Sequence, residues 1–198
     1  FGFLVKQEIT YYHNRNMIPL RFLLFLFLPP FLNAQTPLVW YHVSDTHVPI
    51  KQTEQTIRFI SKSALIDRPA FVIITGDLTE FGGEKDFENY LNLWKDFPAK
   101  VYSIPGNHDN TWYSLSHRIA DLHGGNFYSF RSGDITFFAL NTATLQDPRP
   151  SFSKEQLVWL EKDLSYVPEG STVVVAFHIP SALDENDIKK FEYANISG

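Results

Sequence analysis

The chain has 198 residues, of which 44% are hydrophobic and 20% are charged, and this composition is typical of a globular protein rather than a disordered one. It contains no cysteine, which excludes disulfides, thiolate metal ligands and a cysteine nucleophile. The formal net charge of −5 argues against a surface that binds a nucleic-acid backbone.

The first element along the chain is an apolar run, residues 22–28, which we interpret as the centre of a signal peptide. Arg21 precedes the run, two prolines follow it, and it is shorter than the about 20 residues that cross a bilayer. A buried core helix is the alternative interpretation. We expect export to the periplasm or the extracellular space, and three segments: upstream read-through at 1–16, a signal peptide at 17–34 and the mature domain at 35–198.

Strand-like and helix-like segments alternate from residue 38 onward. Short runs rich in β-branched and aromatic residues predict strands at 38–44, 71–74, 101–104 and 173–177. Apolar residues at helical spacing predict helices at 53–66 and 84–97, and a capping box at 153–156 predicts the start of a third. Two strand-like runs within 127–140 predict a β-hairpin. This order is typical of a layered α/β fold.

Polar side chains follow four of the predicted strands, at the edge where ligands bind in open α/β sheets. They comprise three aspartates, one asparagine and three histidines: Asp45, His47, Asp77, Asn107, His108, Asp109 and His178. Oxygen and imidazole donors of this kind suit Mn, Fe or Zn. Asp45 and His47 are two residues apart, so an extended backbone places both side chains on one side. A glycine before Asp77 and another before Asn107 permit a close approach of the backbone to the site.

Each of these residues taken singly has an ordinary structural explanation. An aspartate after a strand is most often a turn or helix-cap residue, and a histidine such as His178 is most often structural. His123 follows a predicted helix, and we favour a structural role for it over the lining of a substrate pocket. The coincidence of such residues at four strand ends favours a metal site.

The sequence resembles the calcineurin-like metallophosphoesterase superfamily over residues 38–180, and its secreted and cyclic-nucleotide phosphodiesterase-like branch in particular. Four motifs carry the resemblance to the superfamily: Asp45-x-His47, Gly76-Asp77, Gly106-Asn107-His108-Asp109 and the strand-terminal His178. The likeness to the branch rests on the stretch from Trp112 to Asn141 and on Leu157-Val-Trp-Leu160. The resemblance implies an α/β/β/α sandwich of four layers, built from two mixed sheets, with a dinuclear metal site at the strand ends.

The resemblance also implies a ligand set for two metal ions, which are Mn, Fe or Zn. It assigns Asp45 and His47 to the first ion, Asn107 and His178 to the second, and Asp77 as the carboxylate that bridges both. A bridging position needs a ligand with two oxygens, which an aspartate supplies.

The reaction implied by the resemblance is hydrolysis of a phosphomonoester or phosphodiester by a water or hydroxide that bridges the two ions. His108 would act as a general acid or charge stabiliser, oriented by Asp109. The expected partner is a small phosphate ester, with no nucleic acid and no membrane span. A non-catalytic domain that binds phosphate or another ligand is the alternative, and a nuclease-like activity is disfavoured by the negative charge.

The sequence departs from the superfamily in one motif. The Gly-His-x-His segment that would complete both metal shells has no counterpart here, because no histidine follows His178. We therefore expect a C-terminally truncated fragment with an incomplete second sheet. The alternative is a protein that lacks these two ligands.

Overall fold

The computed structural model describes residues 4–9, 37–111, 115–143 and 150–180. Four strands form one sheet in the order β1-β2-β3-β4, comprising β1 (Leu4–Ile9), β2 (Leu38–Val43), β3 (Phe71–Thr75) and β4 (Lys100–Ile104). β1 is antiparallel to β2, whereas β2, β3 and β4 are parallel. A second sheet has the order β5-β6-β7, comprising β5 (Tyr128–Ser132), β6 (Ile135–Ala139) and β7 (Thr172–Ala176). In this sheet β5 is antiparallel to β6, and β6 is parallel to β7.

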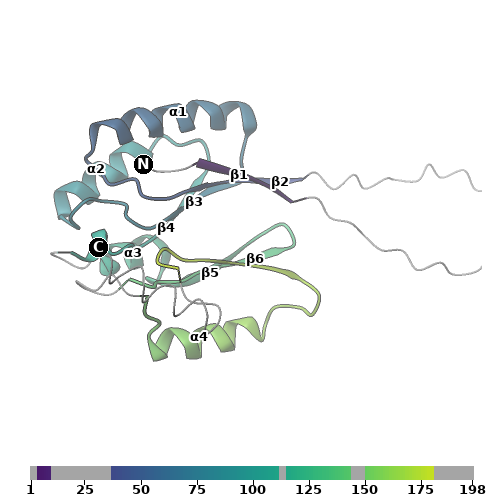
Figure 1. The fold of residues 1–198 in the computed structure, drawn as a ribbon. Coiled ribbons are helices and arrows are strands. Elements are labelled where there is room, and N and C mark those ends of the chain that lie inside the picture. The colour runs from purple at the N-terminus through teal and green to yellow at the C-terminus, as the bar shows by residue number, and fades with distance from the viewer. Residues whose placement is uncertain (1–3, 10–36, 112–114, 144–149, 181–198) are drawn as a thin grey trace, which may run out of the picture.

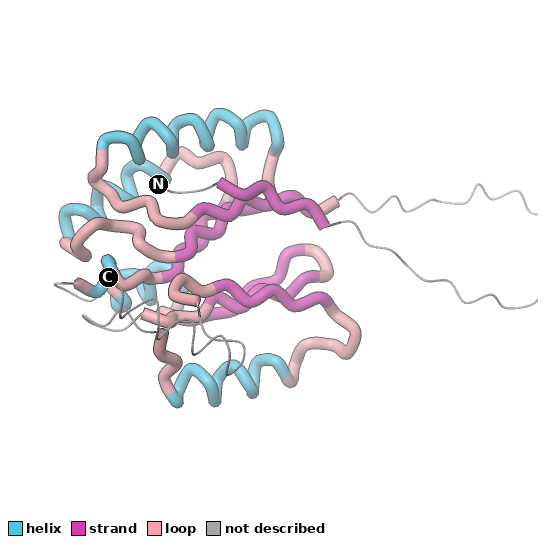
Figure 2. The backbone as a smooth tube through the Cα atoms, viewed as in Figure 1, coloured by secondary structure: helices cyan, strands magenta, loops and turns pink. Residues whose placement is uncertain are grey.

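Helices cover the outer faces of the two sheets, as Figure 1 shows. Helices α1 (Lys51–Asp67) and α2 (Glu84–Trp94) lie on the first sheet, and α4 (Lys154–Leu164) lies on the second (Figure 1). Helix α3 (Ser116–His123) follows a short 3-10 turn, η1 (His108–Asn110). The backbone trace in Figure 2 shows the two sheets facing each other between these helices, which confirms the predicted four-layer arrangement.

The first sheet has an apolar core on each of its faces, because successive residues of a strand point to opposite sides. Tyr41 and Val72 pack with buried residues of α1 and α2. Trp40 and Phe71 instead face Phe137 of the second sheet, with ring centroids 5.3 and 5.0 Å from that phenyl ring. β3 is buried along its whole length, as predicted for a parallel strand between two layers.

The local predictions agree with the structure closely. The capping box is formed on one side, since Ser153 accepts a hydrogen bond from the backbone N–H of Gln156. The Gln156 side chain does not return to the helix start. It pairs instead with the backbone of Asn141 through two hydrogen bonds of 2.7 and 2.9 Å.

The N-terminal assignment stays a prediction. Residues 4–9, which we interpreted as upstream read-through, form β1, while 17–34 lies outside the described residues. Within the described parts of the chain, no helix is long and apolar enough to cross a membrane.

Candidate metal centre

The loops after β2 and β3 run side by side and extend the pairing of these strands toward the site. The backbone N–H of Asp45 donates to the carbonyl of Gly76, and that of His47 donates to the carbonyl of Asp77. These hydrogen bonds are 3.1 and 2.8 Å long. The main chain therefore holds three of the predicted ligands next to one another.

The backbone of these ligands is not extended. Asp45, His47 and Asp77 have φ angles of 58°, 44° and 50°, in the left-handed region that side chains other than glycine rarely adopt. The predicted reason for the proximity of Asp45 and His47 was therefore wrong. Left-handed conformations cost about 1–3 kcal/mol each and persist where surrounding contacts hold them, which is common at functional sites.

Two glycines allow the segments of the site to approach one another. A Cβ atom on Gly76 would lie 2.3 Å from Cγ of His178, and one on Gly106 would lie 2.1 Å from the backbone nitrogen of Asp77. Both distances are far below van der Waals contact. The predicted need for glycine before Asp77 and before Asn107 is thereby confirmed.

One oxygen of the buried Asp77 carboxylate faces the loops after β2 and β4. Asp77 Oδ2 lies 3.7 Å from Nε2 of His47 and 4.0 Å from Nε2 of His108. His47 Nε2 also lies 3.8 Å from Oδ1 of Asp45, whose side chain is 40% exposed.

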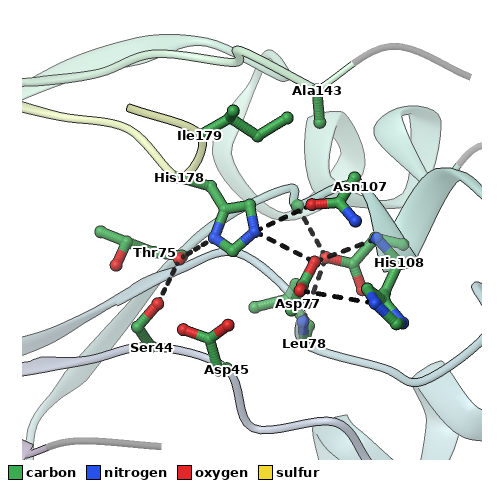
Figure 3. A network of polar contacts seen from close by, with 12 residues as sticks. Ser44, Asp45, Thr75, Asp77, Leu78, Asn107, His108, Ala143, His178 and Ile179 are labelled. Atoms are coloured by element: carbon green, nitrogen blue, oxygen red, sulfur yellow. Dashed lines mark hydrogen bonds and ion pairs between the residues drawn. The ribbon is translucent and has the colours of Figure 1, made fainter. Parts of the chain in front are cut away.

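The other oxygen of Asp77 faces the chain after β7, as Figure 3 shows. Asp77 Oδ1 lies 3.2 Å from Nε2 of His178, and Oδ1 of Asn107 is also 3.2 Å from that nitrogen (Figure 3). Asp77 therefore presents its two oxygens to two different groups of side chains.

The charges of Asp77 and His178 favour each other. Burial raises the pKa of Asp77, but its contacts with His178 and His108 outweigh burial, so that the pKa of Asp77 is lowered. Burial lowers the pKa of His178, and contact with Asp77 reverses this, so that the pKa of His178 is raised.

Backbone carbonyls determine the tautomers of two histidines. Nδ1 of His178 lies 2.8 Å from the carbonyl oxygen of Thr75, and Nδ1 of His108 lies 2.9 Å from that of Glu80. A carbonyl oxygen only accepts, so each Nδ1 carries the hydrogen. In both rings Nε2 is the atom turned toward Asp77.

This set of donors fits metal ions of the predicted kind. Ligand atoms of His47, Asp77 and His108 lie within 4.8 Å of one another, and so do those of Asp45, Asp77 and His178. Two ligands about 2.1 Å from one ion are about 3.0 to 3.4 Å apart, which the 3.2 Å between Asp77 and His178 matches. Asp77 belongs to both groups, and its role as a ligand that bridges two ions stays a prediction. The division of the other ligands between two ions stays a prediction.

Asp109 has a different position from the one we predicted. Its carboxylate accepts hydrogen bonds from the backbone N–H groups of Leu78, Thr79 and Gly106 and from the Thr79 hydroxyl, at 2.8 to 3.1 Å. Within the described part of the chain, none of its hydrogen bonds goes to His108. Asp109 thus joins the loop after β3 to the loop after β4 through these hydrogen bonds and not through a hydrogen bond to the ring that it was expected to orient. Burial raises the pKa of Asp109 to about 6, although these donors oppose the shift.

Two further residues complete the description of the site. Sequence reasoning missed Glu80, which contacts Nδ1 of both His47 and His108. Its only sequence signal is its place three residues after Asp77. His123 has the structural role we favoured, since its Nε2 accepts a hydrogen bond from the backbone of Ser103 at 3.1 Å and its ring stacks on Tyr128.

Known proteins resemble this chain in sequence. The sequence model of one family, described as calcineurin-like phosphoesterase, matches residues 40–196. A probable glycerophosphodiester phosphodiesterase of Arcobacter nitrofigilis is 27% identical, over 72% of this chain and 58% of its own. A 3',5'-cyclic-nucleotide phosphodiesterase of Nostoc is 23% identical, over 77% of this chain and 61% of its own. The human serine/threonine-protein phosphatase CPPED1 is 28% identical, over 75% of this chain and 51% of its own.

The chain spans between about half and about three fifths of the length of these curated relatives. Among solved structures, a dimetal phosphatase from Danio rerio has a similar fold, with a TM-score of 0.57. The match covers 79% of this chain and 77% of that one at 13% identity. This likeness supports the fold.

Proposed function

Because the chain belongs to the calcineurin-like phosphoesterase family, we propose that it hydrolyses phosphomonoester or phosphodiester bonds with two bound metal ions. The observation that carries the proposal is the position of Asp77. Its Oδ2 faces His47, and its Oδ1 faces His178. A single buried carboxylate between two imidazoles is suited to bridge two cations.

The residues that would hold the ions are Asp45, His47 and Asp77 on one side and Asp77, Asn107 and His178 on the other. When bound, a pair of such ions holds phosphate oxygens, lowers the pKa of water and offsets negative charge on the attacking and leaving oxygens. The protein contributes rigid placement: the strained loop of Asp45 and His47 is tied by backbone hydrogen bonds to the loop of Asp77.

Of the three described histidines that face Asp77, His108 is our candidate to give a proton to the leaving group. Its side chain is 36% exposed, against 19% for His47 and 11% for His178. The Nδ1 hydrogen is donated to the Glu80 carbonyl. A neutral imidazole carries one hydrogen, so only the doubly protonated ring can also donate from Nε2. We therefore expect the imidazolium form of His108 to act as the general acid.

The test is hydrolysis of p-nitrophenyl phosphate and of bis(p-nitrophenyl) phosphate with added Mn²⁺, by the full chain and by Asp77→Asn. The variant keeps the shape of the side chain but loses the charge and one oxygen. We expect turnover that EDTA abolishes, that Mn²⁺ restores and that the variant lacks.

The ratio of the two rates identifies the preferred ester class. Folded wild-type protein that binds phosphate without turnover would support the binding-domain alternative if a chain extended by the Gly-His-x-His segment also lacks turnover. Turnover that Asp77→Asn and EDTA leave unchanged would refute the proposed site.

We also propose export of the protein, supported by Arg21 and the apolar run 22–28. The measurement is N-terminal sequencing of the protein after expression in a secreting host. A new N-terminus near residue 35 is expected, and retention of residues 17–34 on the exported protein would contradict the assignment.

A further inference from the structure

The three histidines that face Asp77 differ in what contacts their Nδ1 atoms. Backbone carbonyls contact Nδ1 of His178 and of His108. Nδ1 of His47 instead lies 2.9 Å from Oε2 of the Glu80 side chain. His47 is thus the candidate ligand whose orientation depends on a side chain.

We propose that Glu80 is a positioning residue that turns His47 toward the metal site, a role that rests on the function proposed above. Its carboxylate would accept the Nδ1 hydrogen of His47 and thereby leave the Nε2 lone pair free toward Asp45 and Asp77. Carboxylates placed behind metal-binding histidines fix the tautomer and the ring orientation in this way.

The surroundings of His47 require such an acceptor. Its Nδ1 is buried and has no aligned hydrogen-bond partner among the described residues, and the Glu80 oxygen lies within reach at a poor angle. A buried donor without a partner is unfavourable, because it has given up its hydrogen bonds to water and gained none in return. Alignment of the carboxylate with the ring removes this cost and selects the Nδ1–H tautomer.

The backbone holds Glu80 beside His47. The N–H of Glu80 donates to the carbonyl of Val48 at 3.0 Å, and the N–H of Val48 donates to the carbonyl of Leu78 at the same distance. Val48 and Thr79 also form a β-bridge. The segment that carries Glu80 is therefore paired directly with the segment that carries His47.

Glu80 contacts the face of the site opposite to the candidate ligand atoms. Its Oε2 meets Nδ1 of His47, whereas Nε2 of that ring points to Asp77. The carboxylate is therefore placed behind the ligand and not in the ligand set.

The side chain of Glu80 contacts the His47 ring, and its backbone carbonyl contacts the His108 ring. Its carbonyl oxygen accepts from His108, and its carboxylate lies 3.9 Å from Nδ1 of His108 but 2.9 Å from that of His47. The two imidazole rings meet edge to face, with centroids 4.7 Å apart. A substitution of the side chain removes the contact with His47 and leaves the carbonyl contact with His108 in place.

The experiment compares the full chain with Glu80→Ala, Glu80→Gln and the control Glu88→Ala, which removes an exposed carboxylate from α2. The first measurement is Mn²⁺ affinity by isothermal titration calorimetry. We expect about a 10- to 100-fold loss for Glu80→Ala, a smaller loss for Glu80→Gln because its amide oxygen still accepts, and no loss for the control.

The second measurement is made on the metal-free chain and does not depend on activity. Nitrogen-15 NMR of the imidazoles reports which nitrogen of each ring carries hydrogen. We expect His47 to lose its preference for Nδ1–H in Glu80→Ala, while His178 keeps its tautomer because Thr75 still contacts it. Glu80→Leu, whose side chain has no acceptor, tests the same contact should the alanine variant fail to fold, whereas Glu80→Gln should keep the Nδ1–H tautomer because its amide oxygen still accepts.

An unchanged His47 tautomer in Glu80→Ala, or in Glu80→Leu should the alanine variant fail to fold, overturns the proposal, and so does a Mn²⁺ affinity of that variant equal to that of the control. If the wild-type chain binds no Mn²⁺, the proposed function itself fails. The tautomer of His47 in the metal-free chain then still decides whether Glu80 orients this ring.

Discussion

Replacement of Asp109 by alanine is expected to destabilise the fold and not only the reaction. The side chain is completely buried, and Leu78 and Thr79, which donate to it, are buried as well. Its removal leaves three backbone N–H groups and one hydroxyl without their acceptor. This arrangement makes Asp109 a connector of two loops, in contrast to the predicted role of orienting His108.

The expected magnitude follows from the number of donors. An unsatisfied buried donor costs about 1–3 kcal/mol, so that three N–H groups amount to about 3 kcal/mol at the least. Whole domains are stable by only about 5–15 kcal/mol. Asp109→Ala should therefore lose a large part of the free energy of unfolding, and Asp109→Asn, which keeps one carboxyl-type oxygen, should lose less.

The assay is urea unfolding followed by circular dichroism, with Asp121→Ala on the exposed side of α3 as the control. We expect Asp109→Ala to unfold at a lower urea concentration with an unchanged slope. Asp109→Ala that loses less than about 1 kcal/mol while its turnover collapses would refute this reasoning. That result would restore the predicted role of Asp109 in the reaction.

Three other predictions concern the approach of the loops, a buried histidine and the general acid. Gly106→Ala should abolish Mn²⁺ binding, because its Cβ would lie 2.1 Å from the backbone nitrogen of Asp77. The control Gly83→Ala, whose Cβ would be 3.3 Å from the Asp86 carboxylate, should bind Mn²⁺ as wild type does, and equal affinities of the two variants would contradict the prediction. Burial and Lys100 lower the pKa of His123 from 6.5 to about 4, so only the unfolded chain takes up its proton in this range. The free energy of unfolding should fall by about 3 kcal/mol at most as the pH is lowered from about 6.5 to 4, and urea titrations should show a shallower fall for His123→Gln. His108→Asn should slow the hydrolysis of phosphate esters of alkyl alcohols by about 100-fold or more, and that of p-nitrophenyl esters much less. An equal loss of rate for both kinds of ester would exclude His108 as a general acid.

The fold and the set of candidate ligands could be predicted because both rest on local patterns. The alternation of strands and helices requires only the spacing of apolar residues, and parallel strands such as β3 and β4 place their ends at one edge of the sheet. Asp77, Asn107 and His178 could therefore be grouped before any distance was known. The glycines before Asp77 and Asn107 could also be predicted, since their role follows from backbone geometry.

The tertiary structure decided what surrounds these ligands, because the partners come from distant parts of the chain. Asp109 lies 31 residues from Leu78, and His178 lies 103 residues from the Thr75 carbonyl that determines its tautomer. No local pattern indicates which of several carboxylates will meet a given N–H after folding. The left-handed backbone of Asp45 likewise depends on hydrogen bonds to another loop. Residue types and spacing thus determined which atoms can bind a metal, and packing between the loops determined how these atoms are oriented.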